Sequence, residues 1–188
     1  MYKRQEIVEK ISEEKHDPAW MREFRLKSLE IYNNMQVPDW GPSIDGLNMD
    51  NIATYVRANT NMKGDWKDVP EEIKDTFDRL GIPKAERESL AGVGAQYDSE
   101  LVYHNVRKEV ADQGVVYTDM ESALTGEYAD MVHEHFMKLI TPQDHKFAAL
   151  HGAVWSGGSF VYVPKGVNLE IPLQSYFCLL YTSPSPRD

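Results

Sequence analysis

The sequence predicts an α+β protein in which a helical region comes first and the beginning of a β-domain follows. Three observations predict this class. Residues 6–154 carry apolar side chains at helical spacing, divided by prolines and glycines. After Trp155 the composition changes to aromatic and β-branched residues, which favour strands. Val167, Leu169 and Ile171 then alternate with polar residues, as in a half-buried strand.

Both ends of the chain resemble translated sequencing adapter rather than protein. Residues 1–5 (MYKRQ) and 178–188 (CLLYTSPSPRD) match opposite strands of one transposase adapter. Such additions are set aside before a fold is inferred, so the segment to interpret is 6–177. We expect that segment to be an internal fragment of a longer protein. A flexible Ser/Pro-rich tail after a strand is the alternative at the second end.

Cysteine content and charge exclude several classes of site. The one cysteine, Cys178, lies in the adapter-like tail, so residues 6–177 have no internal disulfide and no cysteine-based zinc site. The chain has 20 basic and 30 acidic residues, a formal charge of −10. An acidic chain repels phosphates, which disfavours general binding to nucleic acid or anionic membranes. No apolar run approaches the ~20 residues that span a bilayer.

Two helices are predicted near the start of residues 6–154. The first covers residues 7–15, with a weak apolar stripe. The second follows Asp17, a suitable N-cap, and Pro18, which suits a first turn. It should end before Pro38. The side chains expected along its apolar side are Met21, Phe24, Leu26, Leu29 and Tyr32.

Turn residues separate the next predicted segments. Residues 38–46 form a loop, and the Asn-rich stretch 48–67 favours neither helix nor strand. A helix should begin at Pro70, where acidic residues suit the helix dipole, and end at Gly81. A short helix is expected at residues 83–90. The apolar face of the helix that begins at Pro70 consists of Ile73, Phe77 and Leu80.

The remaining elements before Trp155 are predicted as helices around one strand. A helix capped by Asp98 or Ser99 should reach Gly114, and residues 115–120 should form a strand. Helix then returns over residues 121–140, broken near Gly126. A last helix is expected from Thr141 and Pro142, carrying Phe147, Ala148 and Leu150. The residues expected to face inward from the first of these helices are Leu101, Val102, Val106 and Val110.

Two glycine-rich segments are interpreted as structural. Gly92-Val93-Gly94 lacks the third glycine of a dinucleotide fingerprint, because Tyr97 stands there, and predicted helix precedes it. It is interpreted as a turn between helices. Residues 155–159 (WSGGS) lack the ending of a phosphate-binding loop and precede a strand. They are interpreted as a pivot from helix into sheet. Pro164-Lys165-Gly166 predicts a tight turn, and Pro172 an edge, a corner or a new strand.

The residues that could act as metal ligands or catalytic groups are also interpreted as structural. His133 and His135 are two positions apart, which points them about 200° apart on a helix, so they are expected to be solvated. His104, His145 and His151 have no matching ligand partners in the sequence. No catalytic triad or paired carboxylate motif is found. The sequence thus predicts no catalytic, cofactor-binding or metal residue, and the residues expected as buried anchors are Trp20, Trp40, Trp66 and Trp155.

Three segments resemble the SufB branch of the SufB/SufD family of iron–sulfur cluster assembly proteins. They are residues 17–30 (DPAWMREFRLKSLE), 69–105 (VPEEIKDTFDRLGIPKAERESLAGVGAQYDSELVYHN) and 146–177, of which AVWSGGSFVYVPKGV and IPLQSYF are the most specific. The resemblance covers nearly all of residues 6–177. It divides the chain into an adapter-derived 1–5, a helical region 6–154, the first strands of a core at 155–177, and an adapter-derived 178–188.

The resemblance implies an architecture and a role. Members have a helical N-terminal region followed by a right-handed parallel β-helix, here truncated. They are scaffolds and not conventional enzymes. They work with the ATPase SufC and with SufD, take sulfur from a cysteine desulfurase or sulfur carrier, and pass nascent iron–sulfur clusters to apo-proteins. The implied compartment is the cytoplasm, or the plastid stroma in a photosynthetic eukaryote.

The chain also departs from the family pattern. Some members carry a cysteine-rich N-terminal motif, whereas residues 6–177 contain no cysteine. The family's important cysteine and its acidic or histidine residues come later, so no ligand is carried over and Cys178 is not offered as one. Two alternatives stay open: a SufD-type partner subunit, and a cupin-like metalloenzyme. A cupin needs a His-x-His set on strands, and the histidines here fall on predicted helices.

Overall fold

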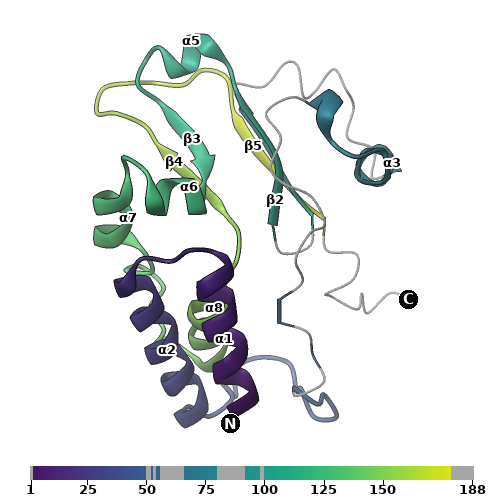
Figure 1. The fold of residues 1–188 in the computed structure, drawn as a ribbon, viewed down its shortest axis with the longest axis vertical. Coiled ribbons are helices and arrows are strands. Elements are labelled where there is room, and N and C mark those ends of the chain that lie inside the picture. Colours follow the sequence, from purple (N-terminus) through teal and green to yellow (C-terminus); the bar gives the residue numbers. More distant parts are fainter. Residues whose placement is uncertain are drawn as a thin grey trace. The chain divides into compact units, whose positions relative to one another are not determined.

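A computed structural model describes residues 2–49, 52, 54–55, 66–79, 92–97 and 100–178 (Figure 1). They divide into two compact units. Unit 1 consists of Met1–Tyr55 and Ala123–Ser156, and unit 2 of Val56–Ser122 and Gly157–Asp188. Each unit is therefore assembled from two segments that are far apart in the sequence.

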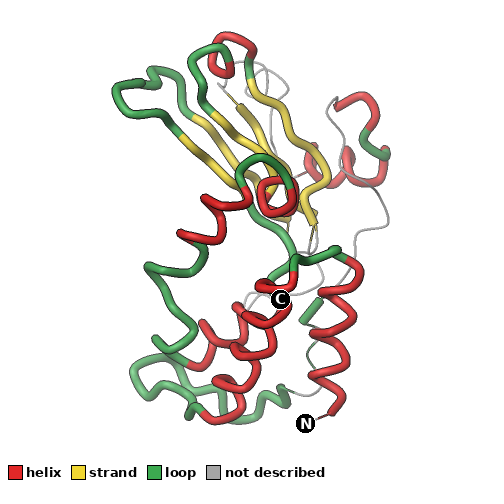
Figure 2. The backbone as a smooth tube through the Cα atoms, turned by 60° about the vertical axis from the view of Figure 1, so that its left-hand side comes forward, coloured by secondary structure: helices red, strands yellow, loops and turns green. Residues whose placement is uncertain are grey.

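Unit 1 is helical (Figure 2). Helix α2 packs against both α1 and α8, which come from opposite ends of the unit's sequence. The short α6 begins in unit 2 and ends in unit 1. The helices are α1 (Tyr2–Glu14), α2 (Ala19–Asn34), α6 (Met120–Thr125), α7 (Ala129–His135) and α8 (Lys146–Val154).

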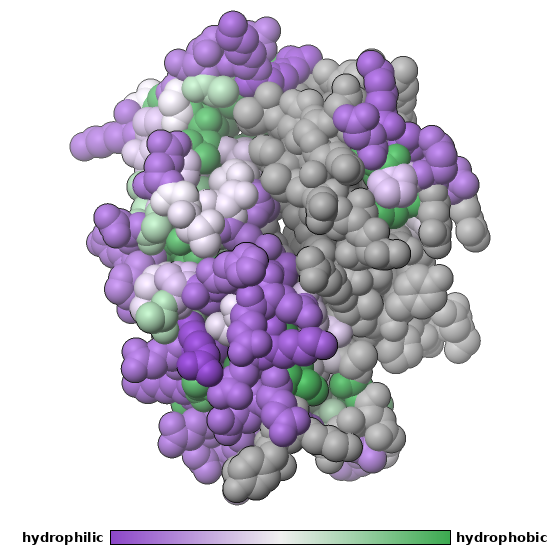
Figure 3. Space-filling view, viewed as in Figure 1, coloured by the Kyte–Doolittle hydropathy of each residue, from purple (hydrophilic) through white to green (hydrophobic). Residues whose placement is uncertain are grey.

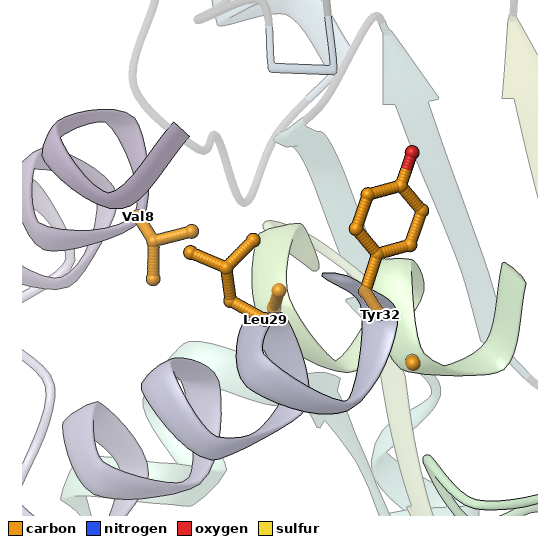
Figure 4. Packing of buried hydrophobic residues seen from close by; sticks show 5 residues of the cluster. Val8, Leu29 and Tyr32 are labelled. Carbon is orange, nitrogen blue, oxygen red and sulfur yellow. The ribbon is translucent and has the colours of Figure 1, made fainter. Parts of the chain in front are cut away.

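The core of unit 1 joins α1, α2 and α8. Val8 and Leu29 face each other across α1 and α2, and Tyr32 lies one turn further along α2 (Figure 4). Helix α8 contributes Ala149 and Ala153, which are fully buried. Each buried Val or Leu side chain stabilises a fold by about 1.5–3 kcal/mol. The alanines let the backbones of α2 and α8 approach closely.

Unit 2 contains two small sheets. In the first the strand order is β2-β1-β5, with β1 antiparallel to β2 and parallel to β5. The second pairs β3 with β4 in antiparallel orientation. The strands are β1 (Gly92–Tyr97), β2 (Glu100–Val106), β3 (Val116–Asp119), β4 (Ser159–Tyr162) and β5 (Leu173–Cys178). The unit also contains η1 (Trp66–Asp68), α3 (Glu71–Arg79) and α5 (Lys108–Ala111).

These elements are a mixture of helix and strand, which is compatible with the predicted α+β class. They confirm several boundaries predicted from the sequence: β3 lies within 115–120, and the break near Gly126 separates α6 from α7. The turn at Pro164 is present, with the Val167 amide donating to the Pro164 carbonyl at 3.1 Å. Residues 155–158 connect α8 to β4 without regular structure, as expected of a pivot.

The helix predicted after Asp98 is wrong over its first half. Residues 100–106 form β2, and helix is confined to Lys108–Ala111. Gly92-Val93-Gly94, interpreted as a turn between helices, belongs to strand β1. Valine and tyrosine favour strands, and pairing with β1, which ends three residues before β2 begins, overrides a helical spacing of apolar residues. Gly114 still ends the segment, with φ of 79°.

Four further expectations differ from the structure or fall outside it. Residues 167–171 alternate in polarity but form no strand; Val167 and Leu169 instead pack against Val110 and Val115. Helix α7 ends at His135, five residues before the predicted end, and α8 begins at Lys146 rather than near Thr141. The helix predicted at 83–90 lies outside the described residues.

Candidate functional site

Unit 1 buries a charged residue, Arg25, at the contact between α2 and α8. Its side chain is 0% exposed. The Nε atom lies 2.6 Å from Oδ2 of Asp17, which is equally buried. The Nη1 atom donates to the carbonyl oxygens of Trp155, at 2.6 Å, and Ala153, at 3.3 Å. These carbonyls belong to the end of α8, where a helix leaves acceptors without intrahelical partners.

Aromatic rings complete the surroundings of Arg25. Its guanidinium lies 4.5 Å from the centre of the Trp155 ring, a cation–π arrangement. The Trp155 ring is 5.0 Å from that of Phe136, and its Nε1 donates to Sδ of Met21 at 3.3 Å. A buried ion pair contributes little net stability, but removal of one partner leaves an uncompensated charge. Asp17 and Arg25 therefore fix the position of the α8 terminus rather than perform chemistry.

The sequence does not reveal this cluster. It predicts Asp17 as the N-cap of α2, whereas Pro18 occupies that position without a side-chain cap and the carboxylate pairs with Arg25. Helical spacing places Arg25 on the face of Met21 and Leu29, yet charged residues are rarely buried without a partner. The sequence feature that could have indicated this buried ion pair is an arginine within the apolar stripe, eight residues after Asp17.

A groove lies beside this cluster, between α7, the following loop and α8. Its volume is about 510 Å³, and it is lined by histidines, by Lys138 and by apolar side chains. His145 caps α8, because its Nδ1 accepts from the Ala148 amide at 3.2 Å. Partial desolvation, and secondarily the charge of Arg25, hold the pKa of His151 below its ordinary value.

Helix α8 is also tied to α2 at its own first residue. The Nζ atom of Lys146 donates to the carbonyls of Tyr32, at 2.8 Å, and Met35, at 2.6 Å. A cation near the end of α2 favours its dipole. Lys146 thus binds one end of α8 to α2, and Arg25 binds the other.

The histidines and tryptophans singled out from the sequence lie as follows. His133 and His135 are exposed on α7, as predicted, and the His133 ring lies 4.4 Å from that of Trp20. The prediction of buried tryptophans holds for Trp155, 4% exposed, and is wrong for Trp40, 74% exposed. His104 lies on β2. Within the described residues, no three His, Cys, Asp or Glu side chains gather closely enough to hold a metal ion.

Unit 2 has a hydroxyl cluster that joins three strands. The Tyr117 hydroxyl donates to the Gln174 carbonyl at 3.0 Å and forms a short hydrogen bond with Ser175. The hydroxyl groups of Ser159 and Ser175 are 3.1 Å apart. Asp119 follows on β3 and accepts from the Ser122 amide at 2.8 Å, at the start of α6. These bonds connect β3, β4 and β5 and contain no acid–base pair of a catalytic kind.

The comparison with protein families decides the relationship. A family model described as the SufBD protein N-terminal region matches residues 5–175. The chain belongs to the SufBD family. The matched range contains the Arg25 cluster, the groove and both sheets except the last residues of β5.

Curated SufBD relatives are similar over almost the whole chain. The iron–sulfur cluster assembly protein SufB of Bacillus subtilis is 56% identical over 172 residues, 92% of this chain. Iron–sulfur cluster assembly SufBD family proteins of Staphylococcus haemolyticus and Staphylococcus aureus are 51% and 50% identical over 91% of it. The chain spans 37% of the length of each of these relatives. Among the described residues, no helix is both long and apolar enough to cross a membrane.

Proposed function

We propose that this chain is the N-terminal part of a scaffold on which nascent iron–sulfur clusters are assembled and then passed to apo-proteins. The observation that carries the proposal is the continuous SufBD match over residues 5–175, together with 56% identity to a protein named as SufB. The cluster is the cargo of this process. The chain acts as a scaffold and not as an enzyme.

The proposed partners follow from the same relationship. SufC supplies ATPase activity, SufD is the companion subunit, and a cysteine desulfurase or its sulfur carrier delivers sulfur. The proposed compartment is the cytoplasm, or the plastid stroma in a photosynthetic eukaryote. We further propose that β5 leads into a right-handed parallel β-helix. The parallel ladder from Gly92↔Leu173 to Tyr97↔Cys178 supports this continuation.

A hybrid protein tests the scaffold role. Residues 6–177 replace the matching region of B. subtilis SufB, and the hybrid is produced in cells depleted of their own SufB. We expect growth, activity of iron–sulfur enzymes, and co-purification of SufC and SufD at the level of the parent protein. A hybrid that is soluble and abundant but restores neither growth nor enzyme activity contradicts the proposal.

The chain alone should not retain a cluster. Iron–sulfur clusters are held by several thiolates, and the chain has one cysteine. After anaerobic incubation with iron, sulfide and a thiol, followed by desalting, we expect no visible absorption and no bound iron. Cys178→Ser serves as the matched variant and should behave identically. A stoichiometric cluster that is lost in Cys178→Ser would show that this chain holds its own ligand.

A further inference from the structure

The loop between α7 and α8 presents two large apolar side chains to solvent. Leu139 is 97% exposed and Ile140 is 63% exposed. Met137, two residues before Leu139, has φ of 48°, a left-handed conformation that is uncommon and costly outside glycine. Its sulfur lies beside Gly152 of α8. The loop is thus anchored at Met137, while the residues after it are directed outward.

These side chains border the groove of about 510 Å³ described above. Phe147 and Ala148 of α8 form part of its apolar wall. A second hollow of about 200 Å³ shares Met137 and Lys138 with the groove and extends to Phe24 on α2. Because the two hollows share Met137 and Lys138, we name them together the α7–α8 groove. Its size is that of an ordinary binding site.

The charge of the α7–α8 groove is opposite to that of the chain. Lys27 and Lys138 line it, together with three histidines, and none of the described lining residues is a carboxylate. The neighbouring Asp144 accepts hydrogen bonds from the amide and hydroxyl of Thr141, at 3.2 Å each. The chain as a whole carries −10. Hydrophilic residues cover the α1 and α2 face of unit 1 in Figure 3. A basic, apolar groove on an acidic protein favours an acidic partner.

We propose that the α7–α8 groove docks an acidic segment of a partner protein, in which leucine, isoleucine or phenylalanine side chains stand beside aspartate or glutamate. The apolar side chains of that segment cover Leu139 and Ile140. Its carboxylates meet Lys138 and Lys27. Burial of exposed apolar side chains supplies affinity, and the complementary charges supply orientation and specificity. This interaction goes beyond the scaffold role and does not depend on a cluster.

Selection from a random displayed peptide library against the full chain tests the proposal. The enriched peptides are then synthesised, and their dissociation constants are measured by fluorescence anisotropy. We expect them to combine acidic and apolar residues. Leu139→Ser and Lys138→Glu should each weaken binding by about tenfold or more, as central interface residues do. Leu47→Ser is the matched control, because Leu47 is also exposed (57%) but lies in another loop.

Several outcomes overturn the proposal. Failure to enrich peptides, enrichment without acidic residues, or equal binding to Leu139→Ser and the parent chain would each do so. Association of the chain with itself that Leu139→Ser abolishes would assign the groove to a second copy. Binding to phosphatidylserine vesicles that Leu139→Ser abolishes, with no peptide enriched, would assign it to a membrane surface. Native-like circular dichroism of the variants shows that changes in affinity do not arise from unfolding.

Discussion

At the residue scale, Arg25 and Asp17 form a fully buried ion pair in unit 1. Both side chains are removed from solvent, and the guanidinium also satisfies two carbonyls at the end of α8. Desolvation of two charges is costly and is offset only while both partners are present. The packing of α8 on α2 therefore requires both members of the ion pair.

Replacement of Asp17 should expose this dependence. Asp17→Asn leaves the guanidinium buried without a counter-charge, so we expect the free energy of unfolding to fall by about 3–5 kcal/mol. Glu9→Gln is the control, because Glu9 pairs with Arg22 at 3.4 Å on the surface, and such pairs contribute about 0–1 kcal/mol. Urea denaturation followed by circular dichroism measures both. Equal stability of the two variants would show that the charge pair is dispensable.

His151 should make the stability of unit 1 depend on pH. Because its pKa is lowered in the folded chain from the ordinary 6.5, the unfolded chain binds the proton more readily. Stability is unaffected above the ordinary pKa and is lost as the pH falls below it. We expect His151→Gln to lose less stability than the parent between about pH 7 and pH 5. Denaturant midpoints across this range measure the effect, and parallel curves would contradict it.

At the scale of elements, the close approach of α2 and α8 depends on small side chains. A Cβ atom added at Gly152 would lie 2.7 Å from Oγ and 3.1 Å from Cβ of Ser28. Ser28 is itself buried, and its hydroxyl donates to the Phe24 carbonyl at 2.8 Å. The contact therefore has no room for another carbon, and a substitution must move one helix.

Gly152→Ala should accordingly weaken the contact between α2 and α8. Alanine favours helix by about 1 kcal/mol over glycine, but overpacking costs about 1–3 kcal/mol, so we expect a net loss of stability. Gly41→Ala is the matched control, since a Cβ there meets nothing within 4 Å. Thermal unfolding compares the two variants. A higher melting temperature for Gly152→Ala would mean that helix propensity outweighs the steric conflict.

At the scale of the whole molecule, the chain exposes strand surface that favours association between copies. Among the described strands, β4 pairs with β3 alone and β5 pairs with β1 alone. Val161 on β4 is 48% exposed, and Val163 just after it is 39% exposed. Unpaired strand edges with apolar side chains promote pairing with other chains.

A charge placed on β4 should reduce this association. We expect Val161→Lys to lower light scattering at raised protein concentration, because a lysine on an edge strand opposes pairing. Val37→Lys is the control, since Val37 is similarly exposed (44%) in a loop of unit 1. Sedimentation velocity over a range of concentrations gives the same comparison. Equal effects of the two lysines would attribute association to general charge and not to the strand.

Turn residues and the spacing of apolar residues predicted the elements that depend mainly on interactions between sequence neighbours. Pro18 marked the start of α2, Gly114 preceded β3, and Pro164 marked a turn. Helical spacing found the face of Met21, Leu29 and Tyr32. The strand at 100–106 was missed because its apolar residues also fit helical spacing, although its partner β1 ends only three residues before it begins. The burial of Arg25 was missed because its acceptors are 128 and 130 positions away. Tertiary partners of this kind leave no periodic signal.

The division of unit 1 between two distant segments also constrains its synthesis. The bonds from Lys146 to Tyr32 and Met35 span 114 and 111 positions. At about 5–20 residues per second, a ribosome needs on the order of ten seconds to make the chain between α2 and α8. Collapse of a short chain takes microseconds, so α1 and α2 can pack on each other through Val8 and Leu29 within that interval. The side of α2 that contacts α8 stays uncovered until α8 emerges.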